Sequence, residues 1–126
     1  MNAPALSSFI DRQAEAFESA LSEDANASLR SFLPSTAHHQ YFELLTELIR
    51  IDIELAWRCG EPRRLNYYLT EYTLLREDRH SLERVAFEEY RQRRIAGEQV
   101  TPRDYVTFGI EPNLWPPIAS ESQKHD

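Results

Sequence analysis

Apolar residues recur every three or four positions over much of the chain, which is the period of an amphipathic helix. The first such pattern covers residues 8–21. A longer one covers residues 37–59, with Ser35 or Thr36 as the expected N-cap and Gly60 as the expected stop. The pattern therefore predicts one helix near the N-terminus and a long helix in the middle of the chain.

A second long helix is predicted at 80–96, where Asp78 or Ser81 offers an N-cap and Gly97 a stop. Short helices are expected at three places: 28–33, 65–72 and 102–107. The last of these begins with a capping-box pattern that has proline at its first helical position.

Helix-breaking residues are far apart, and none of the three glycines lies before Gly60. The expected fold is therefore all-α, with repeated long-helix and short-helix units packed as a compact helical bundle. We expect a single helical domain over residues 1–110 and an irregular C-terminal tail at 111–126, from which Trp115 tucks back onto the core.

The long central helix has one polar stripe and an otherwise apolar surface. Steps of about 100° per residue gather the stripe from Glu43, Glu47, Arg50, Glu54 and Arg58. The apolar surface consists of Tyr41, Leu44, Leu45, Leu48, Ile49, Ile51, Ile53 and Leu55, so this helix should be central and buried. Asp52 is the exception, because it falls in the middle of the apolar surface.

An internal repeat is predicted when the chain is shifted against itself by 37 positions. This shift aligns Asp52 with Glu89, Gly60 with Gly97 and Tyr68 with Tyr105. A shift of 36 positions gives a fainter copy, so the expected units are 9–33, 41–72 and 81–109. Amphipathic helices can share apolar spacing by coincidence, but the Gly-Glu stop and the later aromatic residue favour a stacked repeat, which usually presents a surface to a partner.

The charge balance is 14 cationic against 21 anionic side chains, a net charge of −7. This balance opposes non-specific affinity for nucleic acid or anionic membrane and favours a basic partner. The single Cys59 excludes an intramolecular disulfide, and the first ten residues have no Lys or Arg before an apolar run. We expect a cytoplasmic protein that does not span a membrane, whose oligomeric state stays open.

Asp52 and Glu89, the acids at equivalent repeat positions, are the strongest candidates for residues with a chemical role. Two carboxylates on apolar helix faces could carry out acid–base chemistry. The structural alternative is that each is buried and accepts hydrogen bonds from an arginine such as Arg93 or from the start of a short helix. We favour the structural alternative, because no nucleophile or metal cluster accompanies the two acids.

No metal site, cofactor or catalytic residue is predicted. The adjacent residues His38 and His39 point about 100° apart on a helix and cannot chelate one ion as an i, i+4 pair does. The protein is therefore not expected to be an enzyme.

An arginine–aromatic cluster surrounds Gly60 and consists of Trp57, Arg58, Arg63, Arg64 and Tyr67. Such side chains can hold a protein partner, stack nucleic-acid bases beside phosphates, or simply pack internally. Interleaved acids and the net negative charge favour a protein partner over nucleic acid.

Three runs, ELIRIDIE (47–54), RCGEPR (58–63) and FEEYRQRRIAGE (87–98), are followed by TPRDY at 101–105. Together they resemble the N-terminal segment that precedes the catalytic domain in planctomycete serine/threonine protein kinases. The resemblance covers residues 17–108 and implies a cytoplasmic regulatory or docking segment of bacterial signalling proteins, with no catalytic residues to transfer. The chain has no kinase motif of its own.

The predicted function is accordingly a non-catalytic helical protein-interaction or regulatory module, associated with bacterial serine/threonine kinase signalling. Its partner would be a protein such as a kinase or a kinase substrate. The alternative is a nucleic-acid-binding adaptor that uses the arginine–aromatic cluster.

Overall fold

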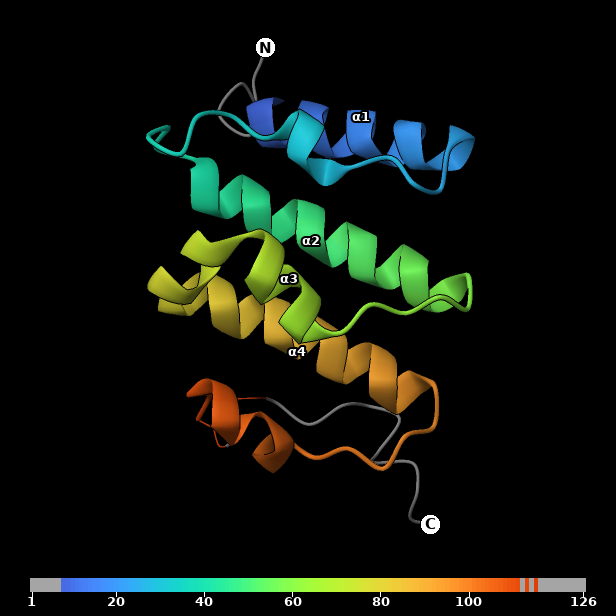
Figure 1. Cartoon of the computed structure of the whole chain (residues 1–126), viewed down its shortest axis with the longest axis vertical. Helices are drawn as coiled ribbons and strands as arrows, with labels where there is room; N and C mark the ends of the chain where they lie inside the picture. Colours follow the sequence, from blue (N-terminus) through green and yellow to red (C-terminus); the bar gives the residue numbers. More distant parts are fainter. Residues whose placement is uncertain (1–7, 112, 114, 116–126) are drawn as a thin grey trace.

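The computed structural model describes residues 8–111, 113 and 115, and every regular element in this part is helical (Figure 1). The elements are α1 (Ser8–Glu23), η1 (Leu29–Phe32), α2 (Tyr41–Arg58), α3 (Leu65–Glu71), η2 (Thr73–Glu77), α4 (Arg79–Ile95) and η3 (Pro102–Phe108), where η denotes a 3-10 helix. No strand occurs among these residues. The prediction of an all-α fold is confirmed.

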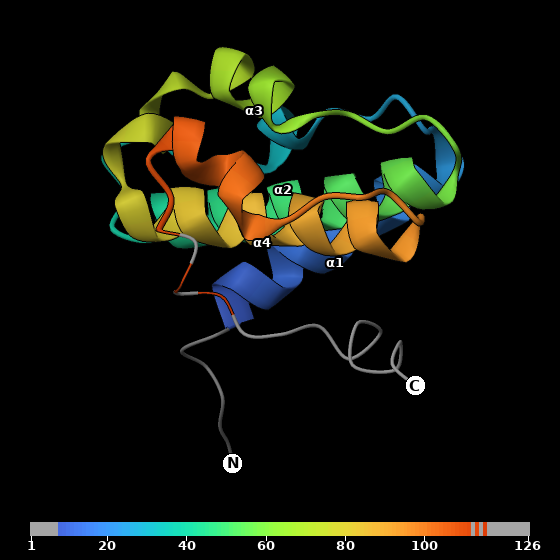
Figure 2. The same ribbon diagram turned by 90° about the horizontal axis from the view of Figure 1, so that it is seen from below.

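The helices form two layers, which Figure 2 shows edge-on. One layer contains α1, α2 and α4, which lie side by side in chain order and run in the same direction (Figure 1). The shorter segments η1, α3, η2 and η3 cross over this layer on one side. Contacts with both α1 and α4 make α2 the central helix, as its apolar surface predicts.

The start of α2 differs from the prediction. The helix begins at Tyr41 rather than near Ala37, because the preceding residues form turns that side chains hold in place. The backbone N–H of Ala37 donates to Ser35 Oγ at 3.0 Å, and that of Gln40 donates to His38 Nδ1 at 3.0 Å. Ser35 therefore caps a turn and not the helix, since local bonds of this kind compete with helix formation.

Other boundaries lie close to their predicted positions. Helix α1 continues two residues beyond the expected end, and η2 was not predicted. Asp78 caps α4 by accepting a hydrogen bond from the Ser81 backbone at 3.1 Å. The capping box at the start of η3 is present, with Asp104 Oδ2 accepting from the Thr101 backbone at 3.0 Å.

The core lies between the two layers and along the contacts of α2 with its neighbours. Phe17, Leu44, Leu48 and other apolar residues of these helices are fully buried. Two residues expected in the core, Ile51 and Leu55, are only half-buried, because they face a cavity beside the end of α1. The prediction for these two residues was wrong.

The two long helices α2 and α4 end in the same way. Gly60 and Gly97 have φ angles of +82° and +92°, a left-handed conformation that favours glycine. The backbone N–H of Glu61 donates to Ala56 O at 2.9 Å, and that of Glu98 donates to Arg93 O at 3.0 Å. Equal bonds thus close both helices at positions 37 residues apart; the wider repeat stays a prediction.

Trp115 packs against the core, as expected. Its ring centroid lies 5.1 Å from that of Tyr90 and 5.2 Å from that of Tyr105. The rest of the predicted tail lies almost wholly outside the described residues, as do residues 1–7 of the predicted domain.

Candidate functional site

Asp52 is buried and accepts two hydrogen bonds from side chains. Its Oδ2 accepts from the Tyr68 hydroxyl at 2.6 Å and from Arg63 Nη1 at 2.8 Å. Only 6% of the residue is exposed, so the carboxylate relies on these donors to offset the loss of water. This arrangement is the structural alternative considered from the sequence.

Glu89 is also buried, with 3% of the residue exposed. Its Oε1 accepts from the Tyr105 hydroxyl at 2.6 Å, and its Oε2 accepts from the Leu65 backbone N–H at 2.8 Å. Leu65 is the first residue of α3, so Glu89 caps that helix. Arg93 was expected to bind Asp52 or Glu89 directly, but it donates to the Tyr105 hydroxyl at 3.2 Å and to Glu98 at 2.8 Å.

Both tyrosine hydroxyls remain protonated donors. Burial raises the pKa of Tyr68 well above its ordinary value of 10, and the neighbouring Asp52 carboxylate raises it further. Burial and the hydrogen bond to Glu89 raise the pKa of Tyr105 in the same direction. The two tyrosine hydroxyls therefore act as fixed donors that link helices through the buried acids.

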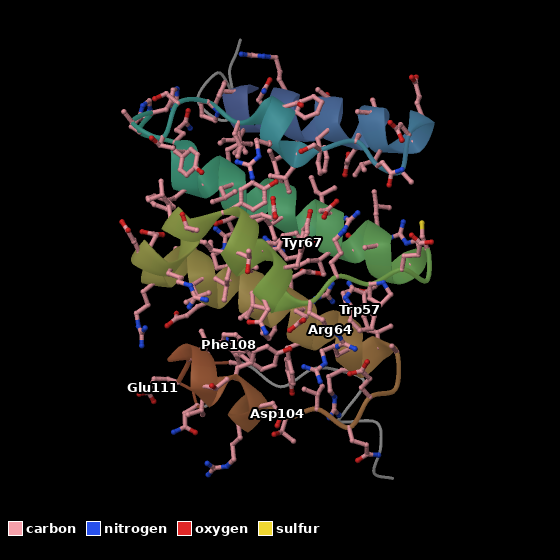
Figure 3. The ribbon with its side chains drawn as sticks, in the orientation of Figure 1. Trp57, Arg64, Tyr67, Asp104, Phe108 and Glu111 are labelled. Atoms are coloured by element: carbon pink, nitrogen blue, oxygen red, sulfur yellow. The ribbon has the colours of Figure 1, made fainter. Side chains whose placement is uncertain are left out.

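The arginine–aromatic cluster separates into pairs in the structure. The Arg64 guanidinium lies over the Trp57 ring, 5.2 Å from its centroid, and pairs with Glu98 at 3.5 Å (Figure 3). Arg63 lies 5.5 Å from the centroid of the Tyr67 ring. In these cation–π contacts, an arginine of the same molecule covers a face of each aromatic ring.

Each arginine of this cluster also has a carboxylate neighbour. Arg58 pairs with Glu54 at 2.7 Å, and Arg63 pairs with Asp52. The positive charge of the cluster is therefore largely compensated, which weakens its attraction for phosphate groups.

A cavity of about 530 Å³ lies between α1 and α2, near the ends of both helices. We call it the α1–α2 groove. Leu21, Ile51 and Leu55 form its apolar part, and Glu18 and Glu61 stand among its polar lining. This groove could not be predicted from the sequence, because helical periodicity places Ile51 and Leu55 on an apolar face without showing whether α1 covers them.

The α1–α2 groove carries uncompensated negative charge. Among the described residues, neither Glu18 nor Glu61 has an ion-pair partner. The other two acids of the lining, Asp52 and Glu54, are paired with arginines. A cationic group that entered the groove would therefore meet two free carboxylates.

No group of three or more potential metal ligands occurs in the part of the chain that the structure describes. His38 stacks on Phe9 and on His39, with centroid distances of 5.0 and 4.8 Å. In the same described part, no helix combines the length and apolar character needed to cross a bilayer.

Comparison with known proteins found no match among protein-family models, curated proteins or solved structures. The kinase resemblance thus rests on the sequence motifs alone.

Proposed function

We propose that this protein is a non-catalytic helical module that binds a protein partner. The observation that carries the proposal is the α1–α2 groove, whose apolar part is formed by Leu21, Ile51 and Leu55. Concave sites that combine an apolar part with polar groups are typical of binding sites. On the α2 side of the groove, Asp52 is joined to α3 by a buried hydrogen bond from Tyr68, which holds this wall in place.

The class of partner is proposed from the sequence motifs at 47–54, 58–63, 87–98 and 101–105. Their resemblance to segments that precede kinase catalytic domains makes a bacterial serine/threonine kinase, or a substrate of one, the first partner to test. A regulatory or docking role in the cytoplasm is part of the same proposal.

The alternative function, a nucleic-acid-binding adaptor, would use Trp57 and Arg64. Both side chains are already engaged with each other, and Arg64 is also paired with Glu98. Together with the net charge of −7, these contacts favour a protein partner.

The two functions can be separated by affinity purification with the tagged full chain at about 50 and about 200 mM salt. A protein partner should be retained at both concentrations and should bind again when both components are purified. Loss of affinity by about a thousandfold or more across this range, with nucleic acid as the retained species, would favour the adaptor. Retention of neither species would contradict the proposed function.

Cys59 provides a way to test whether the partner contacts the groove, because it lines the groove and is the only cysteine in the chain. A photo-crosslinker attached there should capture the partner. The control is a Cys59→Ser, Glu77→Cys variant that carries the crosslinker on η2, where Glu77 is exposed. Equal capture from both positions would contradict binding at the groove.

A further inference from the structure

The spaces on the two sides of α2 can be compared directly. Between α2 and α4 lies a cleft of about 340 Å³, lined in part by Trp57 and Ile95. Between α1 and α2 lies the larger α1–α2 groove, lined at the corresponding positions by Leu21 and Arg58. The two spaces differ in what fills them.

On the α4 side, Trp57 fills part of the space. Its Nε1 is buried and lacks a hydrogen-bond partner, which shows that the indole nitrogen is turned away from solvent. The Arg64 guanidinium covers the ring and pairs with Glu98. An aromatic ring, a cation and a carboxylate thus form one stack, which we call the Trp57–Arg64–Glu98 stack.

On the α1 side, only one of the three equivalent positions carries the same kind of side chain, the carboxylate; the arginines of the lining, Arg58 and Arg63, are paired with Glu54 and Asp52. At a shift of 36, Leu21 stands at the position of Trp57 and Ser28 at that of Arg64; at a shift of 37, Glu61 stands at the position of Glu98. The Ser28 hydroxyl is used locally to accept a hydrogen bond from the backbone of η1. Glu61 has no ion-pair partner among the described residues.

We propose that the α1–α2 groove binds a segment of a partner protein that presents an aromatic side chain next to an arginine or lysine. The aromatic ring would pack on Leu21, Ile51 and Leu55, and the cation would pair with Glu61. This inference rests on the proposed function and specifies the chemistry of the partner. A purely apolar segment would crowd Glu61 without giving its charge a partner, which is unfavourable.

Short acetylated and amidated peptides test this chemistry with the full chain. Gly-Trp-Arg-Gly should shift the amide resonances of Leu21, Leu55 and Glu61 in an NMR titration. Gly-Trp-Glu-Gly should bind at least about fivefold more weakly than Gly-Trp-Arg-Gly. Gly-Ala-Arg-Gly should give no localised shifts. Equal binding of the two tryptophan peptides, or shifts centred away from the groove, would overturn the proposal.

Two variants test the place of binding. Leu21→Trp should fill the groove from within and abolish the shifts caused by Gly-Trp-Arg-Gly. Glu61→Gln should weaken binding of this peptide by about threefold, whereas Glu77→Gln, a matched exposed position on η2, should leave it unchanged. Because Glu61 is exposed, its variant should fold even if Leu21→Trp does not. Unchanged binding in Glu61→Gln would overturn the assignment of the cation to Glu61.

The outcome also separates this inference from the proposed function. If a protein partner binds the unmodified chain and binds Leu21→Trp equally well, the occupant proposed for the groove is wrong while the interaction function stands. If the peptide binds as described but no protein partner is retained, the groove chemistry stands and the proposed function is wrong.

Discussion

The Tyr68 hydroxyl donates a 2.6 Å hydrogen bond to Asp52, a buried carboxylate sixteen residues earlier in the chain. Tyr105 makes a bond of the same length to Glu89, also sixteen residues earlier. Each pair joins a long helix of one layer to a short segment of the other. The shared spacing and geometry show how a helix, a glycine stop and a returning short helix bring one donor to one acid.

The fainter copy near the N-terminus lacks both members of this pair. At a shift of 36, Ala16 stands at the position of Asp52 and Phe32 at the position of Tyr68. Phe32 packs against Phe17 instead, with 5.6 Å between ring centroids. Ala16 is exposed, so this copy has no buried carboxylate that needs a donor, and Phe32 makes an apolar contact in place of a hydrogen bond.

Asp52→Ala should lower the free energy of unfolding by about 1–3 kcal/mol, because it leaves the Tyr68 hydroxyl buried without an acceptor. The larger cost of stranding a buried cation does not apply in full, since the Arg63 side chain is 34% exposed and can reach water. Asp52→Asn keeps an acceptor and should cost less. Chemical denaturation measures both variants, and losses below about 0.5 kcal/mol in each would contradict a structural role for Asp52.

Tyr68→Phe and Tyr105→Phe should each destabilise the protein by about 1–3 kcal/mol, since each removes the donor of a buried carboxylate. Tyr67→Phe is the matched control. Tyr67 is 44% exposed and no hydrogen bond to an acid holds its hydroxyl in the described part, so its loss should cost less than about 0.5 kcal/mol. Equal effects of all three substitutions in urea denaturation would show that the acid–tyrosine links do not contribute.

Stability should fall at alkaline pH. Burial raises the pKa of Tyr68 and Tyr105 in the folded protein, while in the unfolded chain a tyrosine loses its proton near pH 10. Below about pH 10 both states keep these protons, and the contribution of the pairs is complete. Above that pH the unfolded state binds fewer protons than the folded state, so the free energy of unfolding decreases as pH rises.

This dependence can be measured by denaturation on both sides of about pH 10, together with tyrosinate absorbance. A variant with both Tyr68→Phe and Tyr105→Phe should show a shallower decrease in stability than the unmodified chain. Ionisation of all six tyrosines near pH 10 while the chain is still folded would contradict the prediction.

Local features of the fold could be predicted because they depend on neighbouring residues. The spacing along α2 places Asp52 within an apolar face, and the Gly60 stop follows from the end of the pattern. The start of α2 could not be predicted in this way, because Ser35 and His38 offer the backbone competing hydrogen bonds.

The candidate site was less predictable, because it depends on how neighbouring helices pack. Trp57 and Arg64 were predicted to be binding residues, but in the structure both belong to the Trp57–Arg64–Glu98 stack. The α1–α2 groove has Leu21 of α1 and Ile51 of α2 in its lining. Only the packing of α1 against α2 shows that these two side chains meet at one cavity.

Glu89→Ala should loosen the start of α3, because Glu89 Oε2 accepts the hydrogen bond from the Leu65 backbone N–H. Hydrogen exchange of that amide should accelerate by about tenfold or more, corresponding to a lost bond of about 1.4 kcal/mol or more to a charged acceptor. Glu89→Gln keeps a neutral acceptor and should give a smaller acceleration. The Leu45 amide, in the second turn of α2 at a fully buried residue, is the control and should show only the change caused by any loss of global stability. If the Leu65 amide accelerates no more than that of Leu45, Glu89 does not cap α3 in solution.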